Sequence, residues 1–504
     1  MTIRTRVAPS PTGLPHLGTA YVALFNRAFA HQHQGKFVLR MEDTDVERSD
    51  PTSDQAIQDA LRWIGLDWDE GPDVGGPLGP YRCSERLSIY HDLIAELVAI
   101  GGAFYCFCTK ERLDSVRADQ RQQGHVPKYD GHCIGLSTQE IQSHIEEGKP
   151  HVIRLKVPTE GNCVFHDTLR GPIEIPWGQV DMQVLIKSDR FPTYHFAASV
   201  DDHLMEISHI FRGEEWLSSC PKHQLIYTYF GWEQPELIHL PLLRNPDHSK
   251  ISKRKQSTSI NYFRRCGYLP EALLNYLATM GFSMPDEREM FSFQEFREAF
   301  TPSRVSTSGP VFDLAKLSWL NGQYIRSLSH SEFKEKLGDW AFGDGRADSI
   351  LRLVHDRTER FDDVFSQADY LLGERAILKA ELFNHKKITS DDCVRVLYFS
   401  QLLLEQIKNW DSESEVISEA FKQLAELLEL KFREFLFPLF VAISGRSVSL
   451  PLFDSIQILG LDVVNARLRS AINVLGGVSK KTAKRLDSEW HQLASQSIFT
   501  TKTN

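Results

Sequence analysis

The sequence predicts an α/β domain built on a parallel sheet, interrupted by an inserted segment and followed by an all-α half. Strand-like and helix-like segments alternate from the first residue, and the pattern changes between about residues 90 and 190. Residues 376–434 contain neither glycine nor proline. Alternating strands and helices indicate parallel pairing, whereas a long stretch with apolar residues at helical spacing indicates packed helices.

The first elements can be placed in order. We expect a strand at 3–8, a helix at 17–34, a strand at 36–40, and a helix that starts at Ser49-Asp50-Pro51 and ends before Gly65. Inside the inserted segment, residues 151–157 alternate as a half-exposed strand. Ligands of parallel sheets bind at the carboxyl ends of the strands, which is where residues 9–19 would lie.

Length and composition predict a protein of several domains. The 504 residues are too many for one core, and domains of about 100–200 residues give three to four of them. We find neither a signal-peptide pattern nor a run of about 18 apolar residues, so we expect no membrane span. Eight cysteines are too few for a disulfide scaffold, which predicts a cytoplasmic protein.

The net charge of −10 hides a basic cluster. Between His248 and Pro270 there are six Lys or Arg residues and no Asp or Glu. Phosphate affinity depends on local rather than net charge. Two interpretations of this segment therefore remain, a phosphate-binding loop and an ordinary solvated loop.

Residues 8–18 read Ala-Pro-Ser-Pro-Thr-Gly-Leu-Pro-His-Leu-Gly, so that His16-Leu17-Gly18-Thr19 opens a helix soon after a strand. A helix N-terminus offers unpaired N–H groups and a positive dipole end, and it therefore binds anions. The imidazole can donate to a triphosphate, and Gly18 leaves room for a flat base. The alternative is a structural turn of glycine and proline.

A basic segment, Lys250-Ile251-Ser252-Lys253-Arg254, lies far downstream. Nucleotidyl transfer requires charge stabilisation more than bond-making by protein groups. A lysine on a loop can meet the charge that develops on pyrophosphate, and the resemblance described next implies that Lys253 has this role.

The two motifs together resemble the HIGH and KMSKS signatures of class I aminoacyl-tRNA synthetases, with Thr19 in place of the last histidine. Their surroundings are similar to the bacterial glutamyl-tRNA synthetases. The resemblance implies a Rossmann-type class I synthetase catalytic domain with an inserted acceptor-binding domain, followed by an all-α C-terminal anticodon-binding half. The implied bounds are 1–90 and 191–245 for the catalytic domain, 91–190 for the inserted domain, 246–326 for a stem-contact domain with the KMSKS-like loop, and 327–504 for the helical anticodon-binding domains.

The resemblance also implies an activity. L-glutamate would be activated by ATP with Mg²⁺ to glutamyl-adenylate and transferred to the 3′ end of tRNA(Glu), in a protein that is monomeric by family expectation. Whether tRNA(Gln) is also charged stays open. Two alternatives remain: a glutaminyl-tRNA synthetase, whose C-terminal part is built of β-barrels, and a synthetase-like RNA-binding protein without catalysis.

Site residues follow from the resemblance. The catalytic set is His16, Gly18, Lys250, Ser252 and Lys253. The ATP-binding set is Pro9, Ser10, Thr12, Gly13, His16, Gly18, Thr19 and Lys253. For glutamate, Arg6 and Arg212 hold the carboxylates beside Ser10, Glu42 takes the ammonium and Tyr194 lines the pocket. Arg6 in a surface salt bridge is the alternative. Asp201-Asp202 and Gly213-Glu214-Glu215-Trp216 match further family blocks, which we interpret as structure at the sheet edge with contacts to the ATP ribose.

Two further sites are predicted outside the nucleotide pocket. Cys106, Cys108 and Cys133 with the Tyr129 phenolate can complete a tetrahedral zinc site, as in some bacterial family members, and such a zinc would be structural. Buried free thiols are the alternative. Arg360 matches the position where the family reads the third anticodon base, and an exposed helical arginine is the alternative there.

Overall fold

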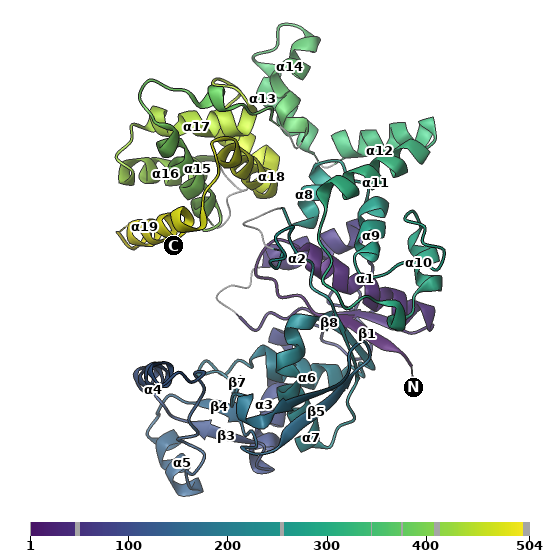
Figure 1. The fold of residues 1–504 in the computed structure, drawn as a ribbon, viewed down its shortest axis with the longest axis vertical. Helices are drawn as coiled ribbons and strands as arrows, with labels where there is room; N and C mark the ends of the chain where they lie inside the picture. Colours follow the sequence, from purple (N-terminus) through teal and green to yellow (C-terminus); the bar gives the residue numbers. More distant parts are fainter. Residues whose placement is uncertain are drawn as a thin grey trace. The chain divides into compact units, whose positions relative to one another are not determined.

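The computed structural model describes residues 2–45, 51–251, 257–343, 345–373, 376–407 and 414–496. The chain divides into two compact units, Met1–Ile251 with Pro270–Leu320, and Ser252–Leu269 with Asn321–Asn504. Every strand of the described residues belongs to the first unit (Figure 1). No helix among the described residues is long and apolar enough to cross a membrane.

The chain begins with a β–α–β unit. β1 (Arg4–Val7) pairs in parallel with β2 (Lys36–Leu39), and α1 (Leu17–Gln32) connects them. Parallel neighbours need such a crossover, and strands covered on both faces are apolar throughout, as in the buried end of β2. With α2 (Pro51–Trp63), the predicted order of strand, helix, strand and helix is confirmed. The residues just before Pro51 lie outside the described part of the chain.

A four-stranded sheet has the order β6-β5-β9-β8. β8 (His209–Gly213) and β9 (Glu236–Leu240) are parallel, and α7 (Cys220–Phe230) connects them. β5 (Asn162–Asp167) pairs in parallel with β9 through its last residue, Asp167. β6 (Gly171–Pro176) is the edge strand and pairs with β5 in the antiparallel direction. β5 and β6 come from the segment that the sequence predicts to be inserted, so this segment extends the sheet that contains β8.

A separate three-stranded antiparallel sheet has the order β3-β4-β7. It consists of β3 (Ala103–Cys106), β4 (Val152–Leu155) and β7 (Val184–Ile186). The prediction of a half-exposed strand is wrong for β4, because β4 is the central strand and its last three residues are buried. Even Arg154 is only 5% exposed, and its guanidinium carbon lies 4.3 Å from the centre of the Tyr129 ring.

The other elements of the first unit are mostly helices. They are α3 (Leu87–Ala99), α4 (Lys110–Gln122), α5 (Thr138–Glu146), α6 (Tyr194–Leu204), α9 (Pro270–Thr279) and α10 (Phe293–Ala299), with 3₁₀ turns η1 (Cys83–Arg86), η2 (Trp177–Gln179), η3 (Glu214–Ser219) and η4 (Pro302–Arg304). The next helix, α11 (Leu314–Ser327), begins in the first unit and continues past its last residue, Leu320. Both α5 and α10 begin with a capping box, in which a serine and the glutamate three residues later satisfy each other's backbone N–H groups.

The second unit is helical, as predicted for the C-terminal half. Its helices are α8 (Ile260–Arg265), α12 (His330–Phe342), α13 (Arg346–His355), α14 (Phe361–Leu372), α15 (Ser390–Leu404), α16 (Ser414–Leu427), α17 (Phe432–Ser444), α18 (Leu452–Val474) and α19 (Lys480–Gln496), with the short turn η5 (Ala380–Phe383). Fully buried Phe399, Phe421 and Phe435 lie on three different helices, α15 to α17. Figure 1 shows α15, α16, α17 and α18 packed together.

The segment after the basic loop packs on this helical half. Arg265, at the end of α8, donates from Nη1 to the Leu459 carbonyl at 2.9 Å, and Arg469 donates from Nη2 to Ser257 Oγ at 2.9 Å. Gly460 has φ 78° and interrupts α18 at this point. A Cβ atom on Gly460 would lie 1.1 Å from Arg265 Nη1, so a larger residue would displace the guanidinium from the Leu459 carbonyl.

Candidate active site

The turn between β1 and α1 puts a histidine at a helix N-terminus. His16 has extended backbone angles (φ −97°, ψ 143°) and is the N-cap of α1, and its Nδ1 accepts a hydrogen bond from the Gly18 N–H at 2.9 Å. The neutral imidazole therefore carries its proton on Nε2, as a donor. Since no acidic residue lies in the first turn of α1, this end of the helix keeps a positive potential.

A pocket of about 520 Å³ lies beside this turn. It is lined by residues at the carboxyl ends of β1, β2 and β8 and by residues after β9. The predicted site residues among them are Arg6, Pro9, Ser10, His16, Gly18, Thr19, Glu42, Tyr194, Arg212 and Lys250. Thr12 and Gly13 are not among the lining residues, and Thr12 is exposed at the tip of the turn.

Arg6, in β1, is held by a buried carboxylate. Its Nε lies 3.1 Å from Asp202 Oδ1 and its Nη2 lies 3.0 Å from Asp202 Oδ2, and each residue is 3% exposed. The alternative of a surface salt bridge is therefore wrong. Asp202 Oδ1 also accepts from Arg40 Nη1 at 2.7 Å, and Arg40 Nη2 donates to Glu42 Oε1 at 3.2 Å.

Asp201 and Asp202 do not have the role that we expected at the sheet edge. Both are on α6, both are buried, and neither lines the 520 Å³ pocket. Asp201 accepts from Arg86 Nε at 2.7 Å and from the Tyr90 hydroxyl at 2.6 Å. The expected ribose contact is thus not supported for these two residues, which instead hold arginines in place.

Glu42 is a buried carboxyl group that faces the pocket. It is 4% exposed, and burial raises its pKa to about 7, although the Arg40 and Arg6 guanidinium groups act in the opposite direction. A ligand ammonium group would favour the ionised form of this side chain. The site therefore offers a receptor for a small cation next to Arg6.

Arg212, in β8, is held by neutral acceptors. Its three nitrogens contact His239 Nε2 (Nε, 2.9 Å), His223 Nδ1 (Nη1, 3.1 Å) and Cys220 Sγ (Nη2, 3.1 Å). The side chain is 5% exposed, lines the pocket and forms no ion pair with any carboxylate of the described residues. A buried cation is unfavourable unless an anion compensates it, so the pocket suits a carboxylate ligand.

Tyr194 and Trp216 form an aromatic part of the wall. Their ring centres lie 4.2 Å apart with a tilt of 35°. Burial, together with the Glu42 charge, raises the pKa of Tyr194 to about 12. Its hydroxyl group is therefore neutral and can donate or accept a hydrogen bond.

Known proteins with the same organisation identify the family. Residues 2–319 match the family of class I tRNA synthetases (E and Q), catalytic domain, and residues 330–472 match an anticodon binding domain. The chain is 54% identical over 492 residues to a glutamate--tRNA ligase from Marinomonas sp. (strain MWYL1), covering 97% of this chain and 99% of the relative. The chain belongs to the glutamate–tRNA ligase family.

Other members of the family agree with this assignment. A glutamate--tRNA ligase from Acinetobacter baumannii (strain AYE) is 51% identical, with 98% of this chain and 97% of the relative covered. The crystal structure of a glutamate tRNA ligase from Elizabethkingia meningosepticum in complex with its amino acid has a TM-score of 0.64 and 32% identity, covering 94% of this chain and 100% of that chain. These likenesses and the helical second unit favour a glutamate over a glutamine enzyme, and the predicted fold class is confirmed.

The second ligase signature lies only partly in the described residues. Lys250 donates from Nζ to Glu215 Oε1 at 3.1 Å, at the edge of the pocket. Glu214, one residue earlier, pairs with Arg170 at 2.7 Å and with Arg244 at 3.3 Å. Ser252 and Lys253 lie outside the described residues, and their predicted roles stay predictions. Glu214 and Glu215 anchor the chain that leads into this motif.

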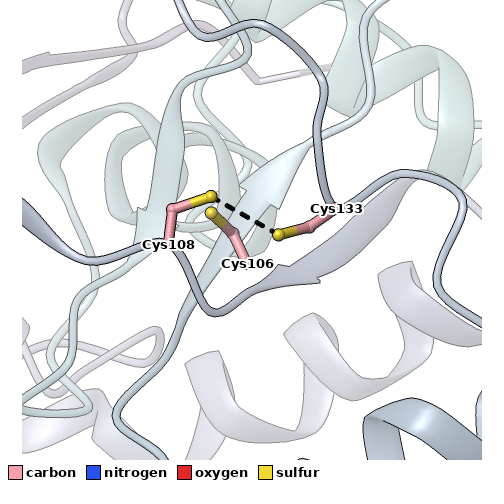
Figure 2. A group of neighbouring side chains, drawn as sticks. All are labelled: Cys106, Cys108 and Cys133. Atoms are coloured by element: carbon pink, nitrogen blue, oxygen red, sulfur yellow. Dashed lines mark hydrogen bonds between the residues drawn. The ribbon is translucent and has the colours of Figure 1, made fainter. Parts of the chain in front are cut away.

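The predicted zinc ligands come together in the three-stranded-sheet region. The Sγ atoms of Cys106, Cys108 and Cys133 all lie within 4.8 Å of one another, and Figure 2 shows them pointing toward a common centre. Tyr129 Oη lies 3.4 Å from Cys106 Sγ and 3.6 Å from Cys108 Sγ, and it accepts from the Cys133 N–H at 2.9 Å. Tetrahedral zinc with Zn–S bonds of about 2.3 Å needs sulfurs roughly 3.8 Å apart, so these donors fit the ion.

Arg360 is an exposed residue at the N-terminus of α14. Its side chain is 75% exposed and lies 3.5 Å from Asp362 and 3.6 Å from Asp363. Two neighbouring aromatic residues are also exposed, Phe361 at 93% and Phe365 at 70%. The exposed arginine is available to a partner, and its position is inside the anticodon binding domain of the family.

Proposed function

We propose that this chain activates L-glutamate with ATP–Mg²⁺ and transfers the glutamyl group to the 3′ end of tRNA(Glu). One observation carries the amino-acid assignment. Arg212 is a buried guanidinium that faces the pocket without a carboxylate partner among the described residues, as in a receptor for an acidic side chain. Arg6 and Glu42 supply the further cation and anion that an amino acid's own carboxylate and ammonium groups require.

In the first step, an α-carboxylate oxygen of glutamate attacks the α-phosphorus of ATP. The new O–P bond forms as the bond to the β-phosphate oxygen breaks, and pyrophosphate leaves. The N-terminus of α1 and the His16 Nε2–H lie on the pocket wall, where they would bind the triphosphate. Lys250 and Lys253 would neutralise the charge that develops on pyrophosphate.

In the second step, the 2′-hydroxyl of the terminal ribose of tRNA attacks the activated carbonyl carbon. The glutamyl ester forms, AMP leaves, and the hydroxyl proton goes to the departing phosphate or to solvent. No residue of the chain becomes covalently bound to substrate, so the protein acts through positioning and electrostatic stabilisation. Arg360 would contact the third anticodon base, which would favour tRNA(Glu) over tRNA(Gln).

The resident metal in this proposal is a structural zinc held by Cys106, Cys108, Cys133 and Tyr129. Three thiolates and a phenolate would complete its tetrahedral shell and crosslink the loops around β3. The site takes no part in either chemical step. The chain would act as a monomer. The cytoplasm is its proposed compartment, and none of its eight cysteines forms a disulfide, which agrees with a reducing environment.

The decisive experiment is the charging of purified tRNA(Glu) and tRNA(Gln) with labelled glutamate in separate reactions. Charging of tRNA(Glu) alone would support a discriminating enzyme that reads the anticodon near Arg360, and charging of both would indicate a relaxed one. Binding of tRNA without any charging would favour the non-catalytic alternative. A Lys253→Ala variant should lose pyrophosphate exchange but keep tRNA binding, and unchanged exchange would remove Lys253 from the mechanism.

A further inference from the structure

Arg212 has neutral groups on all three of its nitrogens. A guanidinium has five N–H donors, and His239, His223 and Cys220 take one donor each. One N–H on each terminal nitrogen is left by these contacts. Two N–H groups on a buried cation are what a carboxylate needs for binding through both of its oxygens.

His239 is itself fixed by a carboxylate. Its Nδ1 lies 2.7 Å from Asp167 Oδ2, and both residues are completely buried. Asp167 Oδ1 accepts from the N–H groups of Leu169 and Arg170 at 3.0 Å. His239 therefore donates from Nδ1 to Asp167 and offers the lone pair on Nε2 to Arg212. Asp167 therefore fixes the orientation of the His239 ring, and the ring in turn holds Arg212.

His223 is part of a second series of hydrogen-bonded side chains, which runs from Arg212 to His195. Its Nδ1 faces Arg212 and its Nε2 lies 3.0 Å from His195 Nδ1. Burial holds the pKa of His223 well below its usual value and lowers that of His195 to about 4, so both rings are neutral at physiological pH. The hydrogen bonds among these three residues then run in one direction: Arg212 donates to His223, and His223 donates to His195.

Arg6 provides the contrast on the same pocket wall. Its guanidinium forms two hydrogen bonds to the Asp202 carboxylate, which largely neutralises its charge. Arg212 is held as firmly, but by groups without charge, and its nearest anchoring carboxylate, Asp167, is one imidazole ring away. Of the two arginines, Arg212 is therefore the one that presents an uncompensated charge to a ligand.

We propose that His223, His239 and Asp167 are positioning residues that fix Arg212 while leaving its charge uncompensated, and that they thereby make the site select the carboxylate of glutamate over the amide of glutamine. The inference rests on the proposed function. An amide would place its own N–H donors against those of Arg212, which leaves polar groups unsatisfied in a buried site. A carboxylate satisfies both donors and compensates the charge.

A matched pair of variants tests this inference. His223→Asn keeps a neutral acceptor, whereas His223→Asp has nearly the same shape and adds a carboxylate beside Arg212. The KM for glutamate in tRNA charging should be higher in the Asp variant than in the Asn variant by about tenfold or more, with a smaller difference in kcat. Inhibition by glutamine relative to glutamate binding should become stronger in the Asp variant only.

A second pair covers the case in which His223→Asp does not fold. Cys220→Asp and Cys220→Ser make the same comparison at Arg212 Nη2, and the same order of KM values is expected. Equal glutamate KM values within each folded pair, or equal discrimination against glutamine, would overturn the inference. Failure of the wild-type chain to charge tRNA with glutamate would instead overturn the proposed function, so the two failures are distinguishable.

Discussion

Arg6 and Asp202 form an ion pair with two contacts between residues 196 positions apart in the chain, with Nε–Oδ1 and Nη2–Oδ2 distances of 3.1 and 3.0 Å. The pair joins β1 to α6, and the same carboxylate also holds Arg40, which in turn contacts Glu42. The carboxylate thus supports both the strand that carries Arg6 and the side chain of Glu42, the proposed receptor for a ligand ammonium group.

Asp202→Asn should therefore destabilise the first unit and weaken glutamate binding together. Removing one partner of a buried ion pair costs about 3–5 kcal/mol, because the remaining charges stay buried. Urea unfolding and the glutamate KM measure the two effects. Glu289→Gln is the control, since its ion pair with Lys316 is exposed and such pairs contribute about 1 kcal/mol or less. Equal losses in the two variants would contradict the buried role of Asp202.

The KM for glutamate should rise as the pH falls below about 7. Burial raises the pKa of Glu42 to about 7, so this carboxyl group is increasingly protonated at lower pH. A neutral Glu42 no longer attracts an ammonium group, and the KM should increase towards about tenfold per pH unit. Glu42→Gln should have a high KM without this pH dependence. A wild-type KM that stays constant from about pH 6 to 8 would exclude Glu42 as the ammonium receptor.

Metal analysis should find about one zinc per chain, and Cys133→Ser should lose it. The variant should also melt several degrees lower, because the metal would hold the loops around β3 together. Cys163→Ser is the matched control, since Cys163 is equally buried but its Sγ contacts Gln224 instead of other sulfurs. Retention of zinc by Cys133→Ser would show that the ion binds elsewhere.

Gly460→Ala should destabilise the second unit by about 2 kcal/mol or more. The residue would keep φ 78° and ψ 155°, which only glycine adopts easily, and the new methyl group would push the flexible Arg265 guanidinium away from the Leu459 carbonyl. Gly476→Ala separates the two effects, because Gly476 has φ 104° but nothing within 4 Å of the added atom. Its loss should stay near 1 kcal/mol. Similar urea midpoints for the two variants would mean that the Arg265 contact contributes little.

Local patterns were sufficient to predict the elements that carry the first signature, residues 9–19. The prolines and glycines of residues 9–18 define the turn before α1, and Phe37, Val38 and Leu39 of β2 form the apolar run of a buried strand. β4 is different, because its alternation of apolar and basic residues looks half-exposed. The sequence does not indicate that an aromatic ring, Tyr129, covers Arg154.

The supporting residues of the site could not be predicted in this way. Asp202 meets Arg6 and Asp167 meets His239 only after distant segments have packed together. A single histidine such as His223 in α7 carries no signal until Arg212 lies beside it. Sequence spacing reports neighbours on one strand or helix, whereas these contacts depend on how the sheet is assembled.

Asp167 is the last residue of β5, and β5 comes from the segment between the two parts of the expected catalytic domain. That segment is therefore not an interchangeable part. A chimaera in which another family's acceptor-binding module replaced residues 91–190 would lose the anchor of His239, even if the new module folded and bound tRNA. Any such exchange would have to end before Asn162, so that β5 stays in the host protein. Asp167 would then still hold His239, on which the proposed selection of the amino acid at Arg212 depends.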